Sequence, residues 1–242
     1  MKISYFNYSK NILISIISIF PFIVLYEIIC FSYFKNTNYQ IRNSADVIIR
    51  DFFSYFGNYS DIAYSLSLAA TLIFIFYIKK NSNSVFKIKY NYLGLMLFEG
   101  LLFGCILLLL LNDNSIFVLN SLTYQNHLLL NLYLCIGAGV WEEILFRVIL
   151  FSLLYNFISY INKGKYDFIN LFFAVILSSV LFSLFHYIGV NADSYNISSF
   201  IIRFIGGVFL SVIYFYRGFG IASISHISYD FILVSLPLIY IN

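Results

Sequence analysis

Charged residues are scarce in this chain: only 10% of its 242 residues are Asp, Glu, Lys or Arg. A soluble domain carries about 25% charged and about 45–50% apolar residues. Here 61% of the residues are hydrophobic and the mean hydropathy is +0.87. These values exclude an ordinary soluble domain. The net charge of +3 is small and spread over loops, so it gives no support to nucleic-acid binding.

Cysteine is also rare, and the three that occur, Cys30, Cys105 and Cys135, all fall inside apolar runs. Their spacing matches neither a metal motif nor a disulfide framework. We expect them to be buried apolar side chains that fill space in the core. The sequence also shows no internal repeat and no low-complexity linker.

The apolar residues form long continuous runs, which decide the fold class. A bilayer admits only helices or a closed barrel, and barrel strands would be short and alternating. We therefore predict an all-α polytopic transmembrane helical bundle. Its seven expected spans are Ile12–Phe34, Ile62–Ile78, Tyr92–Leu111, Leu128–Tyr160, Phe168–Tyr187, Ile197–Tyr216 and Phe219–Ile241.

Four segments carry further expectations. The first run extends beyond 20 residues without a small-residue cleavage site, so we interpret it as a retained span and not a signal peptide. Ser44–Phe56 has apolar residues at helical spacing and predicts an interfacial amphipathic helix. Leu128–Tyr160 is too long for one straight crossing, and Gly137 and Gly139 predict a kink in it. In the sixth run, Gly207 and Ser211 form a small-xxx-small pair that favours close helix packing.

The distribution of lysine and arginine predicts the orientation. Short loops on one side carry Lys79, Lys80, Lys163, Lys165 and Arg217, among others, and the positive-inside rule places them in the cytoplasm. The N-terminus is then cytoplasmic. We divide the single membrane domain into N-terminal helices with the interfacial helix, residues 1–125, and a core that holds the candidate site, residues 126–242.

The stretch Trp141-Glu142-Glu143-Ile144-Leu145-Phe146-Arg147 puts three charges inside an apolar run. Each charge at membrane depth costs about 2.5–3.5 kcal/mol on insertion scales. Glu143 and Arg147 are spaced i,i+4 with the acid first, the favourable order for an ion pair. Glu142 lies about 100° around the helix. We interpret Arg147 as the partner that neutralises Glu143, so that Glu142 stays free for a catalytic role. The structural alternative is an ion triad that locks two helices together.

Two of the three histidines lie in later spans. His186 follows Phe182 by one turn, and His226 precedes Asp230 by one turn. A lone intramembrane histidine is usually a satisfied interhelical hydrogen bond, but this many polar groups are hard to bury except around one shared cavity. A carboxylate base and two imidazoles would provide the groups needed for attack of water on a carbonyl.

The order of these motifs resembles one family. Glu142-Glu143 with Arg147, then Phe182 with His186, then His226 with Asp230 resembles the CAAX protease and bacteriocin-processing (CPBP, or Abi) family over about residues 128–235. The resemblance implies an intramembrane glutamic endopeptidase. It implies Glu142 as general base, His186 as its assistant, His226 and Asp230 on the oxyanion side, and Glu143, Arg147 and Phe182 in support.

The resemblance is incomplete at two positions. Val148 stands where the family often has glycine, and Asp230 stands where asparagine is commoner. An ionised Asp230 would repel an oxyanion, so we expect it to hold His226 protonated or to be protonated itself. Bacterial members similar to this chain are associated with peptide processing or with bacteriocin immunity, which predicts a bacterial plasma membrane location and a peptide or protein substrate.

Several alternatives remain open from the sequence. His186, His226 and a carboxylate would be an adequate zinc shell, although no H-E-x-x-H pair is present; the favoured mechanism needs no metal or other cofactor. A non-catalytic immunity or partner-binding protein and a proton-coupled transporter would use the same residues. Glu27, Glu99 and Arg203 are weaker candidates: Glu99 is expected to pair with Arg147 or line a substrate path, and Arg203 to snorkel or pair with Asp230.

Residue counting raises one difficulty for a shared site. It puts His186 near the outer end of its span, His226 in the inner third of its span and Glu142 between them.

Overall fold

The computed structural model describes residues 4–35, 41–81, 88–111, 128–189 and 192–240. Within these ranges the chain is helical and has no strand, which confirms the all-α membrane bundle. The first helices are α1 (Tyr5–Ser9), α2 (Ile12–Phe34), α3 (Ser44–Phe53), η1 (Ser54–Tyr59), α4 (Ser60–Asn81) and α5 (Tyr90–Leu110). The later ones are α7 (Leu128–Gly137), η2 (Ala138–Glu142), η3 (Ile144–Phe151), α8 (Ser152–Ile161), α9 (Asp167–Phe185), α10 (Ile197–Arg217) and α11 (Phe219–Tyr240).

Five helical runs are long and apolar enough to cross a membrane, counting described residues only: α2, α5, the continuous run Leu128–Ile161, α9 and α10. The described apolar stretches of α4 and α11 are shorter, at Ile62–Thr71 and Phe219–Ser235. The count of seven spans therefore stays a prediction. The first expected span, Ile12–Phe34, coincides with α2, which continues through Pro21.

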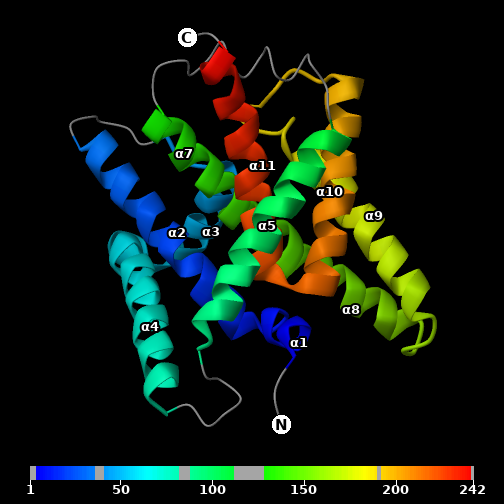
Figure 1. The fold of residues 1–242 in the computed structure, drawn as a ribbon, viewed down its shortest axis with the longest axis horizontal. Coiled ribbons are helices and arrows are strands. Elements are labelled where there is room, and N and C mark those ends of the chain that lie inside the picture. Colours follow the sequence, from blue (N-terminus) through cyan, green and yellow to red (C-terminus); the bar gives the residue numbers. More distant parts are fainter. Residues whose placement is uncertain (1–3, 36–40, 82–87, 112–127, 190–191, 241–242) are drawn as a thin grey trace.

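Helix α11 lies at the centre of the bundle. It packs along α5 and also contacts α2, α7 and α10 (Figure 1). Every residue from Arg217 to Ser228 is buried. The junction of α10 and α11 lies against the start of the chain, where a Cβ on Gly218 would come within 2.9 Å of the Ser9 carbonyl oxygen. The first turns of α11 are therefore enclosed by other helices, with α1 covering the junction.

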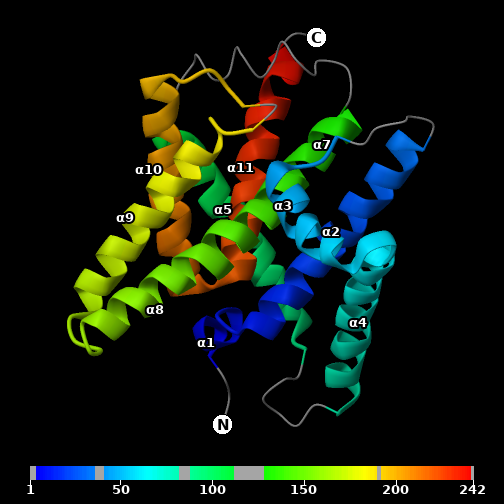
Figure 2. The same cartoon turned by 180° about the vertical axis from the view of Figure 1, so that it is seen from behind.

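The long run Leu128–Ile161 crosses the bundle obliquely, as both faces show (Figure 1, Figure 2). At 1.5 Å per residue, 34 residues extend about 50 Å, well beyond a hydrocarbon core of about 30 Å. Near Gly137 and Gly139 the helix takes a π-helical geometry. It starts at Ala138 and continues, with a break at Glu143, to Phe151. The predicted irregularity is thus a change of helix type, and π-helical turns occur often at functional sites.

Helix α3 follows the predicted amphipathic segment. Of the apolar residues at helical spacing, Ile48 and Phe52 of α3 and Phe56 of η1 are exposed, whereas Ala45 is buried. On the opposite side Asp51 is exposed, and Arg50 pairs with Glu27 of α2 at 2.5 Å. Figure 2 shows α3 between α2 and α7, well inside the height of the bundle. Part of the polar side of α3 therefore lies against protein, and the interfacial location stays a prediction.

Glu99 of α5 does not pair with Arg147, contrary to expectation. It accepts hydrogen bonds from Arg217 Nε at 2.5 Å and from the Tyr5 hydroxyl at 2.6 Å. The pair joins α5 to the end of α10 and to α1. Glu99 is therefore structural and lies outside the cavities described below.

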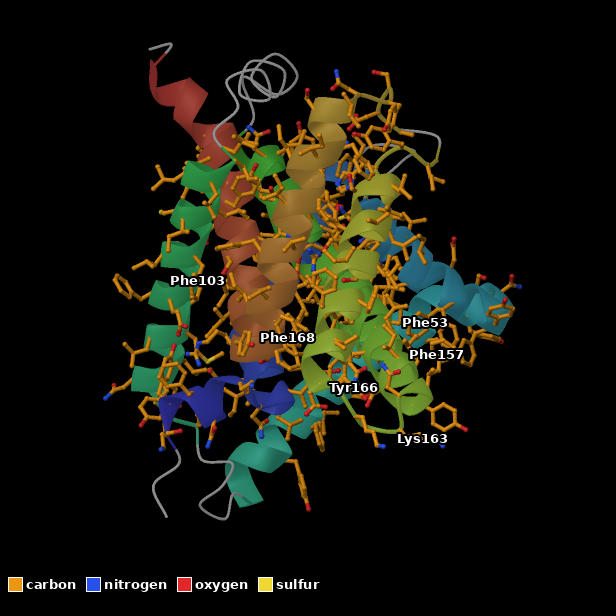
Figure 3. The ribbon with its side chains drawn as sticks, turned by 90° about the vertical axis from the view of Figure 1, so that its right-hand side faces the viewer. Phe53, Phe103, Phe157, Lys163, Tyr166 and Phe168 are labelled. Atoms are coloured by element: carbon orange, nitrogen blue, oxygen red, sulfur yellow. The ribbon has the colours of Figure 1, made fainter. Side chains whose placement is uncertain are left out.

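Helices α8 and α9 form a hairpin on one side of the bundle. Helices α8 and α9 are joined by a short turn with left-handed backbone at Lys163 and Tyr166, and Figure 3 shows both side chains at the lower end of the hairpin. Helix α9 packs against α10. Ser178 and Ser211 come within 3.4 Å there, and a Cβ on Gly207 would meet Ser179 at 3.0 Å. The predicted small-xxx-small contact is present.

The cysteines divide between core and periphery. Cys30 and Cys135 are buried as expected, whereas Cys105 on α5 is exposed. The expectation was wrong for Cys105 because α5 turns that side away from α11.

Candidate active site

The predicted ion pair within the motif is present. Arg147 Nη1 donates to Glu143 Oε1 at 2.8 Å, and both side chains are almost completely buried. The guanidinium also lies 4.4 Å from the centre of the Phe182 ring. A buried charge needs a partner to offset its desolvation, and Arg147 provides it for Glu143.

Glu143 also holds the first histidine of the last motif. His226 Nδ1 donates to Glu143 Oε1 at 2.8 Å, and His226 Nε2 lies 3.5 Å from Asp230 Oδ2. The carboxylate oxygen can only accept when ionised, which assigns the Nδ1 proton to the ring. The ring of His226 thus lies between the carboxyl groups of Glu143 and Asp230.

Glu142 makes its hydrogen bond to a different part of the chain. It is 6% exposed, and its Oε1 accepts a hydrogen bond from Asn43 Nδ2 at 2.8 Å. Asn43 precedes α3, 99 residues away in sequence. Sequence reasoning missed this contact, because no motif or periodicity near Asn43 marks it.

His186 ends α9 at the edge of the same region. Its Nδ1 lies 3.0 Å from the Phe182 carbonyl oxygen, and a carbonyl only accepts, so Nδ1 carries a proton. The Phe182 ring packs edge-on against His186, with centroids 5.1 Å apart, and against His226 at 6.1 Å. Phe182 thus separates the two imidazoles and sets their orientation.

Two cavities meet at Glu142 and His186. The inner one has a volume of about 210 Å³ and is lined by both residues together with Phe182, Arg203, His226, Tyr229 and Asp230, among others. The outer one has a volume of about 440 Å³ and is lined on the α3 side by Arg42, Ser44, Val47 and Ile48. The motif residues on three separate runs therefore border one connected region, as the motif order predicts.

The difficulty raised by residue counting does not keep the three residues apart. Glu142, His186 and His226 line the same cavity, although they come from three different helical runs.

Arg203 does not pair with Asp230, which was one expectation. It pairs with Asp193, in the segment that precedes α10, and lines the inner cavity. Arg203 reaches the outer side of the site, where Asp193 borders the outer cavity.

The crossing of η2 and α11 depends on Gly139. A Cβ at this position would come within 2.6 Å of the Ile227 backbone nitrogen. Ser223 Oγ of α11 donates to the Gly139 carbonyl oxygen at 2.5 Å, and this hydrogen bond joins η2 to α11 at the same crossing. Ile227 follows His226 directly, so this contact fixes the distance between the two motifs.

The described residues contain no group of three or more His, Cys, Asp or Glu side chains placed to hold a metal ion. His226 in particular uses Nδ1 for Glu143 and turns Nε2 toward Asp230. The zinc shell considered from the sequence, with His186, His226 and a carboxylate, has no matching arrangement in this part of the chain.

The fold and site define an integral membrane protein of helical spans with a buried, charged cavity. Residues 124–232, a little under half of the chain, match the model of the Rce1-like family, described as type II CAAX prenyl endopeptidase Rce1-like. This confirms the resemblance to the CAAX protease family and supports a protease, in general terms an intramembrane CAAX-type endopeptidase. Comparisons with curated proteins and with solved structures give no match.

Proposed function

We propose that this protein is a glutamic intramembrane endopeptidase in which Glu142 activates the attacking water. The observation that carries the proposal is the division of labour within the motif. Glu143 is committed to Arg147 and His226, whereas Glu142 faces both cavities and His186. A buried carboxylate beside an open cavity is suited to accept a proton from water.

In the proposed reaction, Glu142 takes a proton as the water oxygen bonds to the carbonyl carbon of the peptide. His186 assists by accepting a hydrogen bond from the same water at Nε2, since Nδ1 is committed to the Phe182 carbonyl. The imidazolium of His226 stabilises the negative charge on the carbonyl oxygen. When the carbon–nitrogen bond breaks, the proton passes from Glu142 to the leaving amine.

Asp230 supports His226 in this scheme. Its carboxylate lies on the far side of the ring from Glu143, and its side chain is 23% exposed toward the cavity. It keeps the imidazolium charged, which suits the presence of aspartate where the family commonly has asparagine. Glu143, Arg147 and Phe182 hold the two imidazoles in place.

The substrate is a peptide or membrane-associated protein, and the setting is a bacterial plasma membrane with the N-terminus in the cytoplasm. Peptide processing or bacteriocin immunity is the biological role we favour. The proposal involves the bilayer and a polypeptide as partners, and no nucleic acid.

A cleavage assay in membranes tests the proposal. Wild type and Glu142→Ala are compared on a peptide library and on a fluorogenic peptide that ends in a prenylated CAAX sequence. Cleavage by wild type alone is expected, with no loss on addition of a zinc chelator. Loss on chelation that zinc restores would favour a metallopeptidase. Cleavage by neither protein would favour a non-catalytic immunity or partner-binding protein, and equal cleavage by both would leave Glu142 with a structural role.

A further inference from the structure

A residue outside the matched family segment contacts the proposed base. Asn43 lies in the N-terminal half of the chain, far from residues 124–232. Its Nδ2 donates to Glu142 Oε1 at 2.8 Å. Glu142 is buried, so this bond forms away from bulk water.

The orientation of the Asn43 amide is fixed by a second role. Asn43 is the N-cap of α3, and its Oδ1 accepts a hydrogen bond from the Ala45 backbone nitrogen at 2.9 Å. Because the oxygen must face the helix, the amide nitrogen must face the other way. The cap therefore determines that Asn43 presents a donor to Glu142.

The helix that carries Asn43 is itself tightly held. Asp46 of α3 is fully buried and accepts hydrogen bonds from Tyr26 of α2 at 3.0 Å and from Arg50 at 2.8 Å. The Tyr133 hydroxyl of α7 donates to the Ile41 carbonyl oxygen at 2.7 Å. These contacts fix the start of α3 against the long run that carries Glu142.

A glycine makes room for this approach. A Cβ on Gly137 would lie 3.2 Å from the Asn43 Cβ and 2.8 Å from the Tyr26 ring. The same residue stands one turn before Glu142 on that run. Gly137 thus lets the cap of α3 reach the carboxylate.

We propose that Asn43 is a positioning residue for Glu142: it fixes the rotation of the carboxylate and turns the second oxygen toward the cavities. This inference rests on the proposed role of Glu142 as general base. The N-terminal half of the chain is then part of the active site, and a core of residues 126–242 alone is incomplete.

The decisive variant is Asn43→Asp. Aspartate keeps the acceptor that caps α3, so the protein should still fold, with a lower melting temperature because Glu142 loses its hydrogen bond. It removes the donor and adds a negative charge beside Glu142. With the prenylated fluorogenic CAAX peptide, kcat should fall about 10- to 100-fold, as for a misplaced catalytic group, with KM little changed.

The pH profile separates positioning from stability. The acid limb of kcat/KM should move to higher pH in Asn43→Asp, because the ionised base loses a donor and gains a like charge. The other charged or titratable groups around Glu142 in the two cavities are unchanged by the variant: Arg42, His186, Asp193, Arg203, His226, Tyr229 and Asp230. Asn11→Asp is the matched control, because Asn11 caps α2 through Leu13 in the same way, away from both cavities.

The failure of this inference is distinguishable from that of the proposed function. If Glu142→Gln is inactive but Asn43→Asp shows wild-type kcat and pH profile, Asn43 has no positioning role. If Glu142→Gln cleaves normally, the proposed function itself is wrong.

A second measurement needs no substrate. The melting temperatures of Asn43→Ala, Glu142→Ala and the double variant form a thermodynamic cycle. We expect the double variant to lose clearly less than the sum of the two single losses. Additive losses would show that the two side chains do not interact and would overturn the inference.

Discussion

Glu143 Oε1 lies 2.8 Å from His226 Nδ1, which joins the first motif to the last across the centre of the bundle. The same oxygen also receives Arg147. One carboxylate thus neutralises a guanidinium on its own helix and orients an imidazole on α11. Adjacent glutamates can serve different purposes because the helix turns them toward different neighbours.

Arg147→Ala is expected to reduce the free energy of unfolding by about 3–5 kcal/mol, because it leaves Glu143 buried without its guanidinium. Thermal melting in detergent and the yield of folded protein in membranes measure this. Arg203→Ala is the control for stability: its partner Asp193 is 57% exposed, so the loss should be at most about 1 kcal/mol. Unchanged melting of Arg147→Ala would refute the scaffold role.

Gly139→Ala is expected to destabilise the protein by about 1–3 kcal/mol, because the added methyl group meets both the Ile227 side chain and, at 2.6 Å, the Ile227 backbone nitrogen of α11, which cannot move aside alone. Gly94→Ala in α5 is the matched control. Nothing lies within 4 Å of its added Cβ, and alanine favours a helix over glycine by about 1 kcal/mol. If both variants melt alike, η2 and α11 do not cross as closely as described.

Glu99→Gln separates stability from catalysis. The change weakens a charge-assisted contact with Arg217 that joins α5 to the end of α10, at a cost of about 2 kcal/mol. Because Glu99 borders neither cavity at the site, kcat per folded molecule should stay at the wild-type value. The check is kcat per folded molecule, with active sites counted by titration, measured together with the melting temperature. A large loss of kcat would show that Glu99 belongs to the candidate site.

The sequence predicts the contacts that lie within one helix. Glu143 and Arg147 pair because i,i+4 spacing alone brings their side chains together. Small residues one turn apart on α10, Gly207 and Ser211, likewise predict that another helix packs closely there, although they do not say which one. The order of the three motifs predicts a shared cavity, since burying their charges separately would cost too much.

Contacts between helices are predicted less well. Whether Glu99 of α5 meets Arg147 of η3 or Arg217 of α10 depends on the depth at which each helix lies in the bundle. One sequence does not give that depth. Arg203 pairs with Asp193, although Asp230 lines the same cavity, because the segment before α10 folds back over the helix.

Asn43 shows the limit most clearly. Its contact with Glu142 joins residues 99 positions apart, and it depends on the cap of α3 and on the space beside Gly137. A sequence signal exists for the cap, in asparagine before a helix. No signal in one sequence connects that cap to a glutamate in another run.

The central claim is that Glu142 is the general base, and Glu142→Gln tests it most directly. Glutamine keeps the size and can still accept the hydrogen bond from Asn43, so insertion and melting temperature should match wild type. It cannot take a proton from water, so kcat on the prenylated fluorogenic peptide should fall at least about 100-fold. Full cleavage by a folded Glu142→Gln protein would contradict the account and leave Glu142 with a structural role.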